Sequence, residues 1–365
     1  MNKKIKAYIA AGGTGGHVLP GYHLAKHLTD QNYDVNLIID KRGHRYMDQL
    51  SGIKFLILPS SPLAKKNFLK IFISLNLIFY SILRSLIFLL FNRPSLIFGM
   101  GGYASFPICV AASILKIKFF IYENNLVIGK ANQYLLPLAN KIFVANNEIE
   151  GIPKKYNNKV IEIGNIIKKE ILYSSNKNSH SSNYQKMNIL VLGGSQAAKI
   201  FAEKLPNIFQ TCSSRGVTLK IFQHCLPSQN DKLKNFYEKN NIEFEIFNFT
   251  YNLENYFSRV NFAITRSGSS MLAELTNAKI PFISVPLPSS ADNHQLKNAN
   301  FYQKKGLAFL IEEKDISSKL SDLIANVFKN KDILKKIIND QSQYSDKNVY
   351  KNINQILKKT FNEKN

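Results

Sequence analysis

Short apolar runs alternate with segments of helical periodicity along most of the chain, a pattern typical of mostly parallel α/β sheets. The first series of runs predicts strands at residues 7–10, 35–39, 55–58, 96–98, 119–122 and 142–144. The second series predicts strands at residues 189–192, 219–223, 244–247, 262–265 and 282–285. Two such series indicate an α/β chain with two doubly wound domains.

A glycine-rich turn follows the first strand of each series. The first turn reads AGGTGGH and runs from Ala11 to His17, and the second reads LGGSQ and runs from Leu192 to Gln196. Glycines at a strand-to-helix turn let backbone amides approach an anion, so we expect each turn to handle phosphate. The duplication predicts two similar domains that face one cleft, and 365 residues are enough for two cores.

The boundary between the domains is predicted near Gly164. This gives an N-terminal domain of residues 1–163 and a C-terminal domain of residues 164–342. A last helix is expected at about residues 343–360, with an apolar stripe that must pack on another element. The stripe consists of Val349, Ile353, Ile356 and Leu357.

A long apolar stretch begins at Ile71 and ends at Phe91, and Arg84 is its only charged residue. Its length and hydropathy would allow it to cross a membrane. A crossing would place the first glycine-rich turn and the strand at 96–98 on opposite sides of the bilayer, although one sheet contains both. We therefore expect a helical hairpin or a long helix docked on the bilayer surface, with a buried core helix as the alternative.

Polar residues on this stretch occupy one narrow face at helical spacing and leave a broad apolar remainder. They are Ser74, Ser81, Ser85 and Asn92. Basic residues flank the stretch and would bind anionic head groups. They are Lys65, Lys66, Lys70 and Arg93. The predicted partner of this region is the anionic surface of a membrane.

The chain has 48 lysines and arginines against 25 aspartates and glutamates, a formal charge of +23. Such an excess favours a membrane leaflet, a polyphosphate or nucleic acid as partner. Nearly all of it is lysine in a chain without tryptophan, so general compositional bias explains it equally well. We expect no nucleic-acid partner, because no aromatic–basic motif is present. The three cysteines have neither an even number nor the spacing of metal ligands, so we expect no disulfides and no structural zinc. This fits a reducing cytoplasm.

The sharpest candidate chemistry lies at TRSGSS, residues 265–270, which ends a strand and opens a helix. Backbone amides and the helix dipole at such a point favour a diphosphate. Glu274, one turn into the helix, could accept hydrogen bonds from both vicinal hydroxyls of a ribose; the alternative is a solvated helix residue. His294 and Gln295 follow the next strand, where α/β sheets bind ligands, and are candidate sugar contacts.

A dinucleotide oxidoreductase is the rival interpretation of such glycine loops. The GGTGGH turn lacks the third glycine of that fingerprint, but Asp40 ends the second strand, where a ribose-binding acid would lie. A P-loop is excluded, because no Gly-Lys pair followed by Ser or Thr closes either turn.

Five motifs, in order across nearly the whole chain, resemble those of the MurG family. They are GGTGGHVLPG at 12–21, GMGGY at 99–103, GGSQ at 193–196, RSG with AEL within 266–275, and DNHQ at 292–295. The resemblance implies a GT-B fold, in which two Rossmann-like domains enclose a cleft and the last helix returns to the first domain. It implies an inverting transferase that moves N-acetylglucosamine from UDP-N-acetylglucosamine to the MurNAc 4-hydroxyl of lipid I. The product would be lipid II for peptidoglycan, made at the cytoplasmic face of the bacterial inner membrane.

The resemblance also assigns site residues. The donor contacts it implies are Thr14, Gly15, Gly16, Asn125, Lys168, Ser195, Thr250, Ser269, Ser270, Met271, Leu272, Ala273, Glu274 and Gln295. Among them, Ser195 would meet the phosphates, Glu274 the ribose, and the backbone near Thr250 the uracil. Acceptor phosphate would lie at Gly13, Gly102 and Tyr103. His17 is either the catalytic base or a ligand of the acceptor diphosphate, and both roles stay open.

Some positions depart from the family pattern. Tyr122 stands where the family usually has the histidine of HExN, and Ile166, Ile167 and Lys168 replace the last three residues of GNPVR. Lysine keeps the charge of arginine but cannot form the same bidentate fork. Ala197 replaces the usual glycine after GGSQ.

No metal or other cofactor is expected. The chain contains no DxD motif, so helix amides near residues 267–270 would neutralise the leaving diphosphate. Two other functions remain open. One is a GT-B transferase that glycosylates another membrane lipid such as diacylglycerol, and the other is a nucleotide-binding surface protein without transfer activity.

Overall fold

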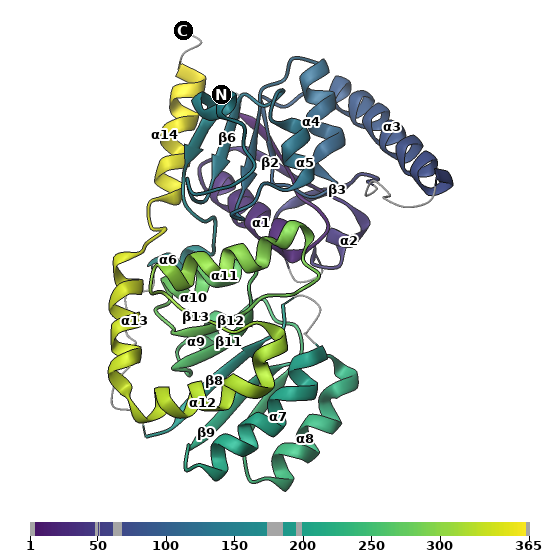
Figure 1. The fold of residues 1–365 in the computed structure, drawn as a ribbon. Helices are drawn as coiled ribbons and strands as arrows, with labels where there is room; N and C mark the ends of the chain where they lie inside the picture. The colour runs from purple at the N-terminus through teal and green to yellow at the C-terminus, as the bar shows by residue number, and fades with distance from the viewer. Residues whose placement is uncertain are drawn as a thin grey trace. The chain divides into compact units, whose positions relative to one another are not determined.

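The chain divides into two compact units (Figure 1). Unit 1 comprises Met1–Lys168 and Asn348–Asn365, and unit 2 comprises Lys169–Lys347. The structure, a computed structural model, describes residues 4–47, 50, 52–60, 68–173, 185–194 and 199–362.

Unit 1 is built on a parallel sheet of seven strands in the order β3-β2-β1-β4-β5-β6-β7. The strands are β1 (Lys6–Ala10), β2 (Asp34–Ile39), β3 (Lys54–Ile57), β4 (Leu96–Gly99), β5 (Phe119–Glu123), β6 (Lys141–Val144) and β7 (Val160–Glu162). The helices are α1 (Gly15–Asp30), α2 (Lys41–His44), α3 (Phe68–Phe91), α4 (Ser105–Ile114), α5 (Lys130–Leu135) and α14 (Val349–Asn362). The strand order reverses between β1 and β4, and both glycine motifs of this unit follow these two strands.

Unit 2 repeats this plan with six parallel strands in the order β10-β9-β8-β11-β12-β13. The strands are β8 (Met187–Leu192), β9 (Leu219–His224), β10 (Glu243–Phe247), β11 (Phe262–Arg266), β12 (Phe282–Val285) and β13 (Phe309–Leu310). The helices are α6 (Lys169–Tyr173), α7 (Lys199–Ser214), α8 (Asn230–Lys239), α9 (Glu254–Phe257), α10 (Ser269–Asn277), α11 (His294–Lys304), α12 (Ile316–Lys329) and α13 (Lys331–Gln343).

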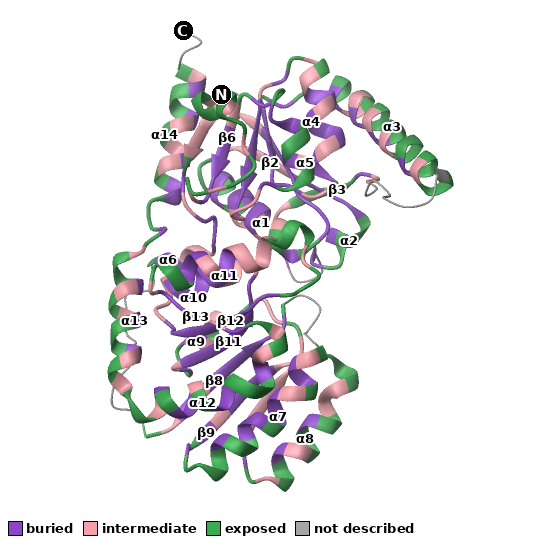
Figure 2. Ribbon diagram, in the orientation of Figure 1, coloured by how far each residue is buried: buried purple, intermediate pink, exposed green. Residues whose placement is uncertain are grey.

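The predicted α/β class and every predicted strand are confirmed, with ends shifted by a residue or two. The sequence analysis missed β7 and β13, which are short strands of three and two residues at sheet edges. Central strands are buried on both faces, as Figure 2 shows, because helices cover each side of a parallel sheet.

Helix α3 presents its apolar side to the surface and its polar side to the unit. Ser74, Ser81 and Ser85 are buried, and their hydroxyls donate to the helix's own carbonyls at 2.9, 2.6 and 2.7 Å. These short, internally satisfied side chains let α3 pack on α4. Large apolar side chains are exposed instead, among them Phe72 at 59% and Phe79 at 61%, and Figure 2 shows α3 mostly exposed.

Of the two predicted forms, a helical hairpin or a long helix, the long helix is the one observed, because residues 68–91 form one continuous helix. The alternative of a buried core helix is wrong, since its apolar side chains are exposed. The helix is long and apolar enough to cross a membrane by length and composition alone. However, β3 before it and β4 after it lie in one sheet, so a single crossing by α3 is incompatible with this fold.

The last helix, α14, closes unit 1. Val349, Ile353 and Leu357 are buried, and Asn354 Oδ1 lies 2.9 Å from Nε2 of His27 on α1. The hydroxyl of Tyr350 donates to the carbonyl of Ile167 at 2.7 Å. The end of the chain is therefore part of the core of the unit that the beginning of the chain forms.

Candidate active site

The first glycine-rich loop joins β1 to α1. Two of its amides are held by side chains of the unit: that of Gly13 donates to Asp40 Oδ1 at 3.0 Å, and that of Gly15 donates to the Tyr46 hydroxyl at 3.0 Å. These two amides are engaged within the unit. Thr14 and Gly16 are exposed and stay candidates for ligand contact.

A second glycine loop of unit 1, residues 99–103, follows β4 and contacts the first glycine loop. A Cβ at Gly102 would fall 2.4 Å from the Gly12 carbonyl oxygen, and one at Gly101 would fall 2.9 Å from the ring of His17. Both glycines have positive φ, of 88° at Gly101 and 75° at Gly102, which other residues rarely adopt. The structure thus brings His17 and Gly102 together. Tyr103, the next residue, is exposed.

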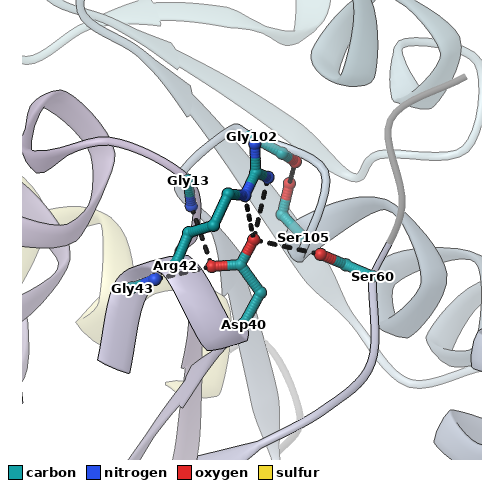
Figure 3. Close-up of polar contacts among 7 residues, drawn as sticks. All are labelled: Gly13, Asp40, Arg42, Gly43, Ser60, Gly102 and Ser105. Atoms are coloured by element: carbon teal, nitrogen blue, oxygen red, sulfur yellow. Dashed lines mark hydrogen bonds and ion pairs between the residues drawn. The ribbon is translucent and has the colours of Figure 1, made fainter. Parts of the chain in front are cut away.

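The Asp40 carboxylate, at the end of β2, accepts five hydrogen bonds (Figure 3). Oδ1 accepts from the amides of Gly13 and Gly43, and Oδ2 accepts from Arg42 and from Ser60. Burial alone would raise the pKa of Asp40, but these hydrogen bonds and the Arg42 charge lower it below its usual range. The carboxylate is therefore committed to its own unit, which contradicts the ribose-binding role required by the oxidoreductase interpretation.

A second buried carboxylate, Glu123 at the end of β5, holds the predicted sugar contact Asn125. Glu123 Oε1 accepts from the backbone and side-chain nitrogens of Asn125 at 3.2 and 3.0 Å. Its Oε2 accepts from the Gly129 amide at 2.9 Å and from Asn132 Nδ2 at 3.0 Å. Sequence reasoning missed both Glu123 and Asn132. The sequence does contain a signal for Glu123, because this acidic residue directly follows the apolar run at 119–122.

Two departures from the family pattern meet in space. Tyr122 stands at the histidine position of the family pattern. Its hydroxyl accepts a hydrogen bond from the amide of Ile166 at 3.0 Å and lies 3.3 Å from the Gly164 carbonyl oxygen. Ile166 replaces a proline, which has no amide hydrogen to donate. The departure at Ile166 creates a buried donor, and the departure at Tyr122 supplies its acceptor. Lys168, half-buried, follows this segment at the end of unit 1.

In unit 2 the predicted diphosphate site is the start of α10. A Cβ at Gly268, which precedes the helix, would meet no atom of the described residues within 4 Å. The approach to it is fixed by Ser267, whose hydroxyl lies 2.7 Å from that of Ser284 and whose carbonyl accepts from Asn298 Nδ2 at 3.1 Å. Arg266 is buried and forms an ion pair with Glu313.

The other predicted residues of α10 differ in where they lie. Ser269 and Glu274 are largely buried, and Ser270 and Met271 are half-buried. Leu272 and Ala273 have their side chains in the core. A ligand at this helix would therefore meet its first turn rather than those two side chains.

Three further predicted contacts lie in loops. Gln295 Oε1 accepts from the Leu287 amide at 2.9 Å, which fixes the side chain across the loop after β12. The Thr250 hydroxyl accepts from the Asn252 amide at 3.2 Å in the loop after β10. Ser195 and Ala197 lie outside the described residues. Within the described part of the chain, no three His, Cys, Asp or Glu side chains are grouped so as to hold a metal ion.

Two family models match the chain. They are the glycosyltransferase family 28 N-terminal domain over residues 7–144 and the glycosyltransferase family 28 C-terminal domain over residues 188–355. The chain belongs to glycosyltransferase family 28. The first match includes both glycine loops of unit 1, and the second includes the start of α10.

Relatives place this family 28 chain in the MurG family that its motifs resemble. It is 35% identical over 368 residues, the whole of both chains, to the UDP-N-acetylglucosamine--N-acetylmuramyl-(pentapeptide) pyrophosphoryl-undecaprenol N-acetylglucosamine transferase of Pelagibacter ubique. It is 33% identical over 346 residues to the Rickettsia felis protein of that name, covering 93% of this chain and 94% of the other.

A solved structure shows the same fold. The crystal structure of Acinetobacter baumannii MurG matches with a TM-score of 0.77 at 23% identity, covering 98% of this chain and 100% of that one. Together with the two parallel-sheet units, this match confirms the predicted GT-B fold of the family 28 chain.

We predict that the Tyr122 hydroxyl stabilises unit 1 of this family 28 chain through the Ile166 amide. Tyr122→Phe leaves that buried donor without its acceptor, which should lower the free energy of unfolding by about 1–3 kcal/mol. Thermal and denaturant unfolding would measure the loss. Tyr8→Phe is the matched control, because Tyr8 is a buried tyrosine whose hydroxyl makes no hydrogen bond with the described residues. Equal effects of the two substitutions would contradict the prediction.

Proposed function

We propose that this chain transfers N-acetylglucosamine from UDP-N-acetylglucosamine to the MurNAc 4-hydroxyl of lipid I, which yields lipid II for peptidoglycan. Full-length identity of 35% to a transferase named for this donor and this acceptor carries the proposal. Membership of family 28 in both halves of the chain supports the same reaction class. The enzyme is accordingly a hexosyltransferase of cell wall biogenesis, with roles in cell shape and cell division.

Unit 2 would bind the donor. The first turn of α10 contains Ser269 and Ser270, and no atom of the described residues would meet a Cβ at Gly268 before it. The helix dipole there favours the negative charge that grows on the departing UDP. Glu274 lies further along the same helix, where its carboxylate would accept hydrogen bonds from the ribose hydroxyls. Gln295 would contact the transferred sugar and the Thr250 backbone the uracil. Lys168, the last residue of the first segment of unit 1, would contact the phosphates or base.

Unit 1 would bind the acceptor. Gly13, Gly102 and Tyr103 would meet its diphosphate. Asn125, held by Glu123, would contact hydroxyls of the donor sugar. In an inverting displacement the 4-hydroxyl attacks the sugar C1, the bond from C1 to the UDP oxygen breaks, and the hydroxyl proton leaves for a base. His17 lies against the second glycine loop, where it would take this proton or bind the acceptor diphosphate.

The site of action would be the cytoplasmic face of the inner membrane. The exposed apolar side of α3 supports this location, because soluble proteins rarely leave so many large apolar side chains in water. Lys70 and Arg93, at the two ends of the helix, would add attraction for anionic lipid.

We expect transfer of labelled sugar from UDP-N-acetylglucosamine to a lipid I analogue, and we expect it to continue in EDTA. A reaction with diacylglycerol as acceptor is run in parallel. Label on lipid I alone supports the proposal. Label on diacylglycerol alone would replace it with glycosylation of another lipid, and UDP binding without any transfer would leave a nucleotide-binding protein.

We expect His17→Ala to lower kcat by about 10²–10⁴ if His17 is the base, because a positioned base contributes a factor of that size. The dissociation constant for UDP-N-acetylglucosamine should not change. If His17 binds the acceptor diphosphate instead, the substitution should mainly raise the KM for lipid I. His23→Ala, on the same helix, is the control. Unchanged kcat and unchanged acceptor KM would contradict both roles.

We expect the double variant Phe72→Ser, Phe79→Ser to lose at least about tenfold in affinity for vesicles that contain phosphatidylglycerol. Each exposed phenylalanine would contribute roughly 1.5–3 kcal/mol when buried in lipid. Co-sedimentation with vesicles measures the affinity. Leu226→Ser removes an exposed apolar side chain from unit 2 and should leave it unchanged. Equal binding by all three proteins would show that α3 is not the docking surface.

A further inference from the structure

Arg42 is a cation at the first glycine loop that sequence analysis did not single out. Its guanidinium carbon lies 5.6 Å from the centre of the Tyr103 ring. Its Nη2 lies 3.4 Å from the position that a Cβ on Gly13 would occupy. Gly13 and Tyr103 are two of the three residues expected at the acceptor phosphates. Figure 3 shows the side chain extending from the start of α2 past Asp40 toward Gly102.

The Asp40 carboxylate fixes the orientation of Arg42. Nε and Nη2 of Arg42 donate to Asp40 Oδ2 at 3.1 and 2.8 Å. Asp40 is itself held, since it is buried and accepts from the Gly13 and Gly43 amides and from the Ser60 hydroxyl. The guanidinium is therefore preorganised beside the glycine loop, although 48% of the Arg42 side chain is exposed.

One edge of the guanidinium remains available. The two nitrogens that face Asp40 leave Nη1 with no hydrogen-bond partner among the described residues. Nη1 carries two N–H donors, and arginine is suited to phosphate because its donors form a rigid planar fork. Asp40 offsets one positive charge, but Arg45 lies three residues further along the chain, so Asp40, Arg42 and Arg45 together keep a positive charge.

From this geometry we propose that Arg42 binds the diphosphate of the acceptor, and that Asp40 is the positioning residue that aims it. The inference rests on the proposed function, and it extends the acceptor site beyond the glycine loops. The acceptor is favoured over the donor because Arg42 lies in unit 1 with Gly13 and Tyr103, whereas the helix start expected to hold the donor diphosphate belongs to unit 2.

Arg42→Gln tests the binding role. Loss of a charge-assisted hydrogen bond to phosphate should raise the KM for the lipid I analogue at least about tenfold, with the KM for UDP-N-acetylglucosamine within about twofold of wild type. Lys41→Gln removes the same charge from the neighbouring position and should leave both values nearly unchanged. Arg42→Lys should recover only part of the loss, because lysine lacks the fork.

Asp40→Asn separates positioning from folding. The Asn Oδ1 can still accept from the Gly13 and Gly43 amides, while an amide nitrogen replaces Oδ2 and no longer accepts from Arg42. This variant should raise the acceptor KM with little change in donor KM. The double variant with Arg42→Gln should be no worse than Arg42→Gln alone. If Asp40 and Arg42 had only a structural role, the variants would instead lower the melting temperature and raise the KM values for both substrates. That result would overturn the inference.

Direct binding of farnesyl diphosphate, measured by calorimetry, tests the site without turnover. Wild type and Lys41→Gln should bind it, and Arg42→Gln should bind it at least about tenfold more weakly. If wild type transfers no sugar but this difference is seen, the proposed function fails and the Arg42 site stands. If transfer to lipid I occurs but Arg42→Gln changes neither the acceptor KM nor this binding, the Arg42 inference alone fails.

Discussion

The contact between the two glycine loops of unit 1 is the constraint on which its site depends. The loops leave β1 and β4 at the point where the strand order reverses, which is where open α/β sheets bind ligands. They can touch only because Gly102 has no side chain, since a Cβ there would lie 2.4 Å from the Gly12 carbonyl oxygen. The strand order thus places the two loops at the same edge of the sheet, and glycine allows their backbones to touch. Together they set the position of the His17 ring.

Buried carboxylates hold the first glycine loop and the segment after β5 in place, and in unit 2 neutral contacts of Ser267 act beside the Arg266–Glu313 ion pair. Asp40 fixes the first glycine loop through the Gly13 amide, and Glu123 fixes the segment that carries Asn125. A buried charge is costly unless donors surround it, and each of these two acids accepts at least four hydrogen bonds. In unit 2, hydroxyl and amide contacts of Ser267 position the segment before α10.

Sequence predicted what depends on local pattern. Strand runs, the glycine turns and the start of α10 were all visible, because apolar periodicity and glycine placement are local signals. Some hydrogen bonds that hold the site join residues far apart in sequence, as those of Gly15 with Tyr46 and of Tyr122 with Ile166 do. A local sequence pattern cannot predict hydrogen bonds between residues that are distant in sequence. The narrow serine face of α3 was visible too, but only the packing on α4 shows that this face is the buried one.

Unit 1 is discontinuous, and this determines the order in which a growing chain can complete its two cores. On the ribosome, every residue of unit 2 is made before α14, whose buried Val349, Ile353 and Leu357 complete unit 1. Unit 2 can therefore finish folding while the surface of unit 1 that receives α14, including His27, is still uncovered. The unit whose synthesis begins first is therefore the one whose core is completed last, and until α14 is made it exposes the apolar surface that α14 covers.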